Sequence, residues 1–516
     1  MSDQPNFLFI ITDQHRADHT GFGGNPLVRT PCLDALAKRS MQFDRAFVAN
    51  PICMPNRSSI LTGRMPSVHG TRFNGVPLDW ASETFVRVLR EAGWDTALIG
   101  KAHFQNFGLG AGLIARFFPS SRDAVRARYA KGWDEYENRA RHAEGRVAVA
   151  DDFYGFAHTD LVLGHGDQCG GHYYQWLVEQ GIDPAAQGAA FAVDRYEGWQ
   201  QVYKPAVSQE HYPTSYVEKQ SVQYIEDAAL RDNPFFLWCS FPDPHHPFTP
   251  PGEYWEMYDP ADVELPRTFE DAHGDSLPIY RQRLKHKGSQ RGPVQPFAVS
   301  ADQLRHAAAA EYGMISMLDS AIGRILESLE RTGQANNTIV VFTSDHGDMF
   351  GDHGMMLKGG MHYEGCLRIP LLISAPGRKA GASSALVSSI DLAQTLLEAA
   401  GLPPYHGMQG KSLMPLLEDP TQELRESLLI EEDEILDMAG LGVPLRMRTL
   451  LTQTARLTLY DGADAGELFD LEKDPDELRN LFADRSAQAQ RAALTERLSR
   501  LLMATADTAP IPTHFA

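Results

Sequence analysis

The sequence predicts an α/β protein with a large, mostly parallel central sheet flanked by helices and a smaller C-terminal α+β subdomain that carries an antiparallel sheet. Uninterrupted apolar, β-prone runs at 7–12, 234–241 and 338–344 are typical of strands buried on both faces of a parallel sheet. Amphipathic helical segments alternate with these runs. Because 516 residues exceed what one simple core holds, we expect a main domain over 1–415 and a C-terminal subdomain over 416–516.

Helices and strands alternate along the first hundred residues. A helical pattern at 30–39 carries a proline in its first turn, which suits a helix start. A second amphipathic helix is expected at 83–92, and the apolar run at 95–100 then reads as a strand. This strand delivers Lys101 and His103 at its end. The order helix, strand, polar residues is typical of doubly wound sheets.

The segment 104–210 lacks clear periodicity and is rich in glycine, aromatic, histidine and arginine residues. Helices are expected within it near 121–136 and 173–180. Long irregular segments of this kind commonly shape binding pockets. We therefore expect an elaboration over the sheet edge that shapes a pocket.

The remaining chain continues the alternation and then changes character. Elements expected in the main domain are helices at 214–229, 301–332 and 391–400 and strands at 234–241, 338–344 and 369–374. Beyond a charged, proline-containing stretch near 416–425, short runs predict strands of a small antiparallel sheet. These are 428–430, 448–452 and 456–460, followed by a strand and loop at 467–481 and a final helix at 487–503.

Charge and cysteine content narrow the function classes. The formal net charge is −20 and no basic stripe is present, which argues against nucleic acid as a partner. An enzyme acting on anionic esters would need a local positive focus within this negative envelope. The five cysteines are scattered and odd in number, so they do not indicate a disulfide framework. With no signal or transmembrane stretch apparent, we expect a cytoplasmic protein without a membrane partner.

The stretch 50–64 places a cysteine at a turn that leads into a helix. Cys53 would face unpaired N–H groups at the helix start, and Arg57 would project toward the same place one turn later. Gly63 ends the helical pattern. Considered alone, Cys53 is more simply interpreted as a small apolar core residue.

Polar residues follow four of the expected strands, where open α/β sheets place their ligands. Carboxylate and amide oxygens there suit a hard cation such as Ca²⁺, and His346 extends the choice to Mn²⁺ or Zn²⁺. The required positive focus is supplied by this metal with Arg57, Lys101 and Lys358. The four sets are Asp13-Gln14, Lys101 with His103, His245-His246 and Asp345-His346.

Motifs in a fixed order connect these sets to a known family. They are Cys-x-Pro-x-Arg at 53–57 with Leu-Thr-Gly-Arg at 61–64, Gly-Lys-x-His at 100–103, Asp-Pro-His at 243–245, Thr-Ser-Asp-His-Gly at 343–347, and Lys358. As a set they resemble the type I, formylglycine-dependent sulfatases of the alkaline phosphatase superfamily. The resemblance covers most of the chain and implies an alkaline-phosphatase-like fold. It also implies that a formylglycine-generating or equivalent maturation enzyme oxidises Cys53 to formylglycine, the nucleophile.

The resemblance implies one divalent metal ion, with Ca²⁺ favoured and Mn²⁺ as the alternative. The implied ligands are Asp13, Gln14, Asp345 and His346 together with an oxygen of the modified Cys53.

The other site residues receive their roles from the same resemblance. Arg57 would support the hydrated aldehyde and the metal-facing carboxylates. Lys101 and Lys358 would bind the ester oxygens. His103 would assist the formylglycine, and His245 would lie beside the leaving-group oxygen.

Two departures from the common sulfatase pattern leave the substrate class open. Asp13 is followed by Gln14 where many sulfatases have a second Asp, and His346 stands where many have Asn. Both features resemble the bacterial branch that includes choline sulfatases and phosphonate monoester hydrolases, whereas the Gly-Lys-x-His step is sulfatase-like.

The leading hypothesis is an arylsulfatase-type hydrolase of a small sulfate ester, which forms a covalent sulfo-enzyme and releases alcohol or phenol, then sulfate. The alternative is a phosphonate monoester or phosphodiester hydrolase with the same nucleophile. A third possibility is an inactive member that acts as a binding protein. A homo-oligomer is expected from the resemblance.

Overall fold

The computed structural model describes residues 4–110, 129–289, 296–435, 443–461, 463 and 465–514. The helix predicted over 121–136 lies largely outside these ranges, and its described end, 129–136, forms turns. Within the described ranges, none of the helices combines the length and the apolar character needed to cross a bilayer.

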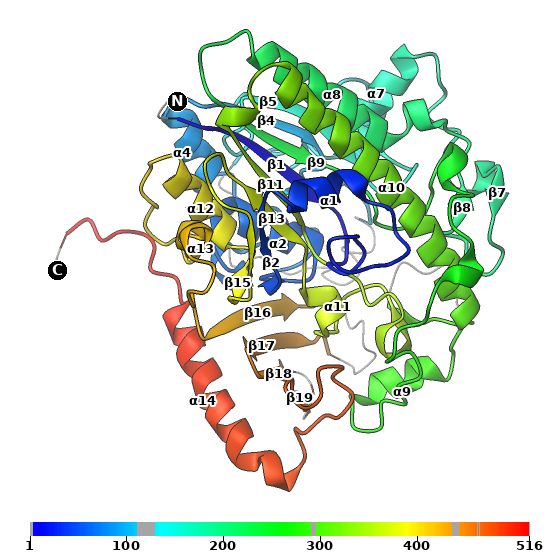
Figure 1. Ribbon diagram of the computed structural model, residues 1–516, viewed down its shortest axis with the longest axis vertical. Coiled ribbons are helices and arrows are strands. Elements are labelled where there is room, and N and C mark those ends of the chain that lie inside the picture. The colour runs from blue at the N-terminus through cyan, green and yellow to red at the C-terminus, as the bar shows by residue number, and fades with distance from the viewer. Residues whose placement is uncertain are drawn as a thin grey trace.

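A nine-stranded sheet forms the centre of the described part of the chain, in the order β14-β2-β13-β11-β1-β9-β4-β5-β6 (Figure 1). β1 pairs in parallel with β11 and β9, and β4 pairs in parallel with β9 and β5. The predicted mostly parallel α/β sheet is therefore confirmed, with antiparallel pairs toward its edges. The strands are β1 (Asn6–Thr12), β2 (Met41–Phe43), β4 (Asp95–Gly100), β5 (His158–Leu163), β6 (Gly170–Gly171), β9 (Phe235–Ser240), β11 (Thr338–Ser344), β13 (Leu371–Ser374) and β14 (Gly381–Ser383).

Strand β1 is buried along its whole length because helices cover both faces of the sheet. Alternate side chains of a strand point to opposite faces, so Phe7 and Phe9 enter one apolar core while Leu8 and Ile10 enter the other. Helices α2 (Cys53–Thr62), α4 (Phe85–Glu91) and α12 (Asp391–Ala399) contribute to the first core. Helices α1 (Pro31–Ala37), α8 (Pro213–Ala228) and α10 (Ala301–Arg331) contribute to the second.

Helix α10 closely matches the helix predicted at 301–332. It begins with a capping box in which the Ser300 hydroxyl accepts from the Gln303 backbone and the Gln303 side chain accepts from the Ser300 backbone. This pairing satisfies two of the otherwise unpartnered groups at the helix start. In Figure 1, α10 runs beside α8 along one side of the sheet.

The predicted C-terminal antiparallel sheet is confirmed as four strands, β16 (Ser427–Asp433), β17 (Arg446–Thr452), β18 (Ala455–Asp461) and β19 (Gly466–Asp470). Helix α14 (Gln488–Ala504) follows and lies along the lower edge in Figure 1. Strand β16 also reaches the main domain, because the Glu431 N–H donates to the Ala49 carbonyl at 2.9 Å. The domain boundary near 416 stays a prediction.

Short elements complete the described chain. The helices are α3 (Pro66–His69), α6 (Arg139–Glu144), α7 (His172–Glu179), α9 (Pro278–Leu284), α11 (Glu364–Leu367) and α13 (Met414–Glu418). The short strands are β3 (Ala46–Phe47), β7 (Asp194–Arg195), β8 (Tyr203–Lys204), β10 (Phe297–Ala298), β12 (Met355–Met356) and β15 (Val387–Ser388).

Candidate active site

Cys53 is the first residue of α2 and is 2% exposed. Extended backbone at Ile52 turns the chain into the helix, and Gly63 ends it with a left-handed φ of 62°. Cys53 Sγ lies 3.1 Å from His346 Nε2 and 3.8 Å from Asp13 Oδ1. Burial, with Asp13 nearby, raises the pKa of the thiol to about 11. The unmodified thiol is therefore neutral and weakly nucleophilic at neutral pH.

Parallel pairing brings the two aspartates of the site together. Thr12 at the end of β1 is in register with Ser344 at the end of β11, so Asp13 and Asp345 emerge from the same sheet edge. The Gln14 N–H donates to Asp345 Oδ1 at 3.1 Å, which fixes that carboxylate at the strand end.

A compact set of donor atoms surrounds the Cys53 sulfur. Their ligand atoms lie within 4.8 Å of one another, and all four residues are buried. The His346 Nδ1–H donates to the Gly347 carbonyl at 2.9 Å, so the lone pair of Nε2 faces the set. Burial lowers the pKa of His346 to about 4, so the ring is neutral. Two carboxylates and a neutral imidazole fit a divalent cation. The set is Asp13, Cys53, Asp345 and His346.

The Arg57 guanidinium bridges the carboxylates of Asp13 and Asp345. Its Nε lies 2.6 Å from Asp345 Oδ2 and its Nη2 lies 3.2 Å from Asp13 Oδ2. Nη1 donates to the Lys101 carbonyl at 2.9 Å and to Ser240 Oγ at 2.8 Å. Burial alone would lower the pKa of Arg57, but Asp345 and Asp13 outweigh it and raise the pKa. The guanidinium thus connects the ends of four strands, β1, β11, β4 and β9.

Lys101 extends the positive charge toward the other side of Asp13. Its Nζ forms an ion pair with Asp13 Oδ2 and donates to His165 Nε2 at 2.7 Å. Burial opposes ionisation of Asp13, yet Lys101 and Arg57 outweigh it and hold the pKa of Asp13 well below its usual range. Lys101 and Arg57 therefore supply the local positive charge that an enzyme acting on anionic esters needs, although the formal net charge of the protein is −20.

Gln14 and Lys358 contact each other. Lys358 Nζ donates to Gln14 Oε1 at 2.5 Å, and Gln14 Nε2 donates to Asp348 Oδ2 at 2.6 Å and lies 3.1 Å from His246 Nδ1. The amide oxygen therefore faces the ammonium in this structure, and the ligand role of Gln14 stays a prediction.

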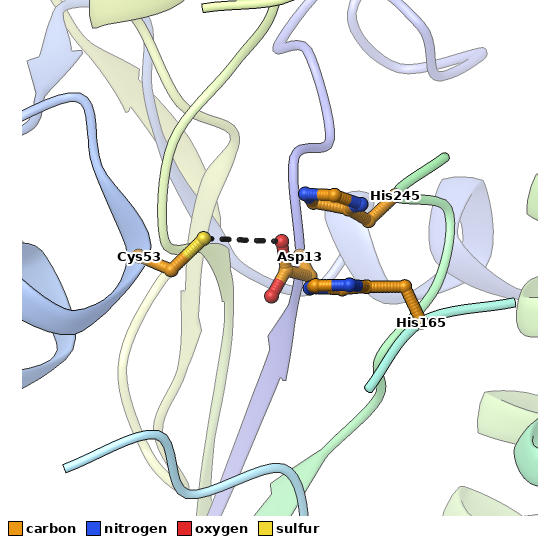
Figure 2. Close-up of side chains that lie close together, drawn as sticks. All are labelled: Asp13, Cys53, His165 and His245. Atoms are coloured by element: carbon orange, nitrogen blue, oxygen red, sulfur yellow. Dashed lines mark hydrogen bonds between the residues drawn. The ribbon is translucent and has the colours of Figure 1, made fainter. Parts of the chain in front are cut away.

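His245 stacks against a histidine that sequence reasoning missed. The His165 and His245 rings lie 3.6 Å apart between centroids with an interplanar angle of 13°. Figure 2 shows both rings with one edge toward Asp13 and with Cys53 on the other side of that carboxylate. His165 lies two residues after the end of β5, much as Asp13 follows β1, so the same strand-end rule could have found it. His165 was missed because the segment 104–210 lacks clear periodicity, so β5 was not recognised as a strand.

His103 adopts a left-handed φ of 57°, and its ring stacks on Phe107 at 4.2 Å. Its backbone N–H donates to Glu137 Oε2 at 2.6 Å. Within the described residues, its Nδ1 is buried without a hydrogen-bond partner. Assistance to the nucleophile stays a prediction.

A cavity of about 430 Å³ lies beside this site. Cys53, Lys358 and His245 line it together with Phe107. Glu432 from β16 also lines it, so the C-terminal sheet forms part of the wall. The cavity could hold a small anionic ester with its charge at the cations and its organic group against the aromatic side.

Comparison with known proteins agrees with this geometry. Residues 5–402 match the family model described as Sulfatase, and residues 351–504 match the model described as N-sulphoglucosamine sulphohydrolase, C-terminal. An arylsulfatase of Clostridium perfringens is 30% identical over 488 residues, covering 93% of this chain and 90% of the relative. A choline-sulfatase of Rhizobium meliloti is 27% identical over 505 residues, covering 95% and 85%.

Among solved structures, the phosphonate monoester hydrolase of Agrobacterium radiobacter superposes with a TM-score of 0.77 at 25% identity, covering 98% of this chain and 96% of that one. The fold is thus alkaline-phosphatase-like, and the sulfatase model matches well over half of the residues. From this match and the arylsulfatase relative, the chain belongs to the sulfatase family of enzymes within the alkaline phosphatase superfamily.

Proposed function

We propose that this protein hydrolyses a small organic sulfate ester of the arylsulfatase type, with a formylglycine derived from Cys53 as nucleophile. The observation that carries the proposal is the position of Cys53. Its sulfur lies beside His346 Nε2 and Asp13 Oδ1, the place that a formylglycine oxygen would occupy. Arg57, bonded to both buried carboxylates, supports the same place.

Asp13, Asp345 and His346 would hold one divalent cation with that oxygen, and Gln14 is the further predicted ligand. Ca²⁺ is favoured by the carboxylates, and Mn²⁺ is the alternative that the imidazole favours. When bound, the metal activates an oxygen nucleophile and neutralises charge that develops in the reaction.

The side chains around the cavity would handle the ester. Lys101 and Lys358 would bind the non-bridging oxygens, whose charge grows in the transition state. The His245 Nδ1–H donates to the His246 carbonyl at 2.5 Å, so its Nε2 edge is left for the leaving-group side of the cavity. Lys358 carries protons that a poor leaving group would need. His103 follows β4, as Lys101 does, and would assist the nucleophile.

A second candidate is a phosphonate monoester or phosphodiester hydrolase with the same nucleophile. The specific support is the superposition on the phosphonate monoester hydrolase of Agrobacterium radiobacter. The 30% identity to an arylsulfatase supports the leading candidate.

The two candidates differ in their rates on matched esters. We expect a larger kcat/KM for an aryl sulfate than for an aryl phosphonate monoester with the same phenol. A much faster reaction with the phosphonate would overturn the leading candidate in favour of the second.

Conversion of Cys53 is tested by mass spectrometry of the peptide 41–64. The chain is coexpressed with a formylglycine-generating enzyme, and we expect the mass of an aldehyde or its hydrate in place of the thiol. An unchanged cysteine together with absent turnover would favour an inactive binding protein. A Cys32→Ala variant is the matched control, because Cys32 lies outside the donor set.

A further inference from the structure

We propose that His165 is a positioning residue that holds Lys101 and His245 in the orientations from which both face the bound ester. This inference rests on the proposed ester hydrolysis at Cys53. His165 lies two residues after the end of β5, in the segment 104–210, and its ring lines the same cavity as Cys53.

The first contact of His165 orients the Lys101 ammonium. Lys101 Nζ is held on one side by Asp13 Oδ2 and on the other by His165 Nε2 at 2.7 Å. An ammonium has three N–H donors, and these two acceptors fix two of them. The third is left to donate to an ester oxygen. Without His165 the flexible lysine would have, among the described residues, the Asp13 carboxylate alone to direct its ammonium.

The second contact orients the His245 ring. The His245 Nδ1–H donates to the backbone carbonyl of His246 at 2.5 Å, and the ring face lies on His165 at 3.6 Å. One contact fixes the tautomer and the other restricts rotation about the side-chain bond. In Figure 2 the two rings present the same edge to the site. The stack thus keeps His245 Nε2 at the cavity.

An alternative role for His165 is that of a second metal ligand. Ligand atoms of Asp13, Cys53, His165 and His245 lie within 4.8 Å of one another. However, the Lys101 ammonium already occupies the lone pair of His165 Nε2, and a cation placed beside it would be repelled. The geometry therefore favours positioning over metal binding, and metal content decides between them.

Two substitutions separate the contacts. His165→Phe keeps a flat ring for the stack on His245 but removes the acceptor for Lys101. His165→Gln keeps an acceptor but removes the stack. For His165→Phe we expect kcat/KM to fall by about 10- to 100-fold on every aryl ester, since a misdirected donor costs less than an absent one.

For His165→Gln we expect an effect that depends on the leaving group. His245 lies on the leaving-group side, so kcat for an ester of a poorly acidic phenol should fall about 10-fold or more. The ester of a highly acidic phenol, which departs unaided, should change by less than about 3-fold. A residue that only stabilises the fold would lower both rates equally.

His158 supplies the matched control, because it begins β5 and is exposed away from the cavity. His158→Phe and His158→Gln should leave both esters unchanged. Melting temperature and formylglycine content are measured for every variant, so that loss of folding or maturation is distinguished from loss of positioning.

Several results would overturn the proposal. Rates within twofold of wild type for both His165 variants would do so, as would equal losses on good and poor leaving groups in His165→Gln. Two metal ions per chain in the wild type, falling to one in both variants, would assign His165 as a ligand instead. If the wild type hydrolyses neither ester, the proposed function fails. The ¹⁵N shifts of the His245 ring then test positioning, with one Nδ1–H tautomer expected in wild type and His165→Phe. In His165→Gln the unstacked ring can rotate away from the His246 carbonyl, so a mixture of tautomers is expected.

Discussion

Arg57 Nε lies 2.6 Å from Asp345 Oδ2, and neither side chain is exposed to solvent. The same guanidinium contacts Asp13, so Arg57 bridges two buried carboxylates at the ends of neighbouring strands, and Lys101 also pairs with Asp13. Removing one partner of a buried pair leaves an uncompensated charge, which costs far more than the net value of the pair.

Replacing Arg57 by Met should therefore destabilise the protein strongly. We expect the free energy of unfolding to fall by about 3–5 kcal/mol. Urea denaturation in the presence of a chelator measures it, so that a bound metal does not mask the loss. Arg64→Met is the control, because Arg64 pairs with the part-exposed Asp507 and should cost about 1 kcal/mol or less. A similar small loss for both variants would contradict the expectation.

Metal binding should raise the melting temperature, and this rise should depend on Asp345 as a ligand. A ligand that binds only the folded state adds about 2.7 kcal/mol at one hundred times its dissociation constant. We expect Ca²⁺ or Mn²⁺ added after chelation to raise the melting temperature of the wild type and of Asp419→Asn, which alters a partly exposed carboxylate outside the donor set. Asp345→Asn should show no such rise. An undiminished rise in that variant would place the metal elsewhere.

Glu137 should make stability depend on pH. Its carboxylate accepts the N–H groups of His103, Phe104 and Gln105 at 2.6, 2.8 and 2.8 Å, yet burial dominates and raises the pKa of Glu137 to about 7. A raised pKa means that the stability contributed by the bound proton is complete below the ordinary value near 4.5 and is lost as pH rises through about 7.

The stability difference between wild type and Glu137→Gln should therefore shrink as pH rises from about 5 to about 8, because the variant lacks this proton. Urea midpoints across that range provide the measurement, with the partly exposed neighbour Glu135→Gln for comparison. A difference that stays constant or widens would show that Glu137 is ionised throughout.

Gly100 should not tolerate a side chain. It has a φ of 107°, and an added Cβ would lie 1.8 Å from the Ser240 carbonyl oxygen. Gly93 has a similar φ of 105°, but a Cβ there would meet open space. A substitution at Gly93 therefore shows the cost of the backbone conformation without a steric clash. We expect Gly93→Ala to cost about 1–2 kcal/mol and Gly100→Ala about 1–3 kcal/mol more. Activity should fall only for Gly100→Ala, which displaces Lys101; equal effects at both positions would contradict the close approach.

The part of the site that follows buried strands could be predicted because the signal is local. The apolar run ending at Asp13 and the run ending at Asp345 each define a strand, and parallel pairing then brings the two residues together. The antiparallel C-terminal sheet was predictable for a similar reason, from short runs such as 448–452.

Contacts that depend on long-range packing were not predictable. His165 lies in a segment without periodicity, and only the fold shows that it stacks on His245. Glu432 reaches the cavity through the docking of β16, which no local pattern encodes. The Gln14 oxygen faces Lys358 because Asp348 orients the amide from the opposite end, a contact 334 residues away in sequence.

The hydrogen bond from Glu431 to Ala49 has a consequence for the order of events during synthesis. Cys53 leaves the ribosome long before residue 431, by about 20–80 s at 5–20 residues per second. During that interval β16 is missing, and Ala49, four residues before the cysteine, lacks its hydrogen-bond partner Glu431. In the finished fold the sulfur is almost inaccessible, since Cys53 is 2% exposed. The growing chain would therefore leave Cys53 open to the proposed maturation enzyme, whereas the completed fold buries it.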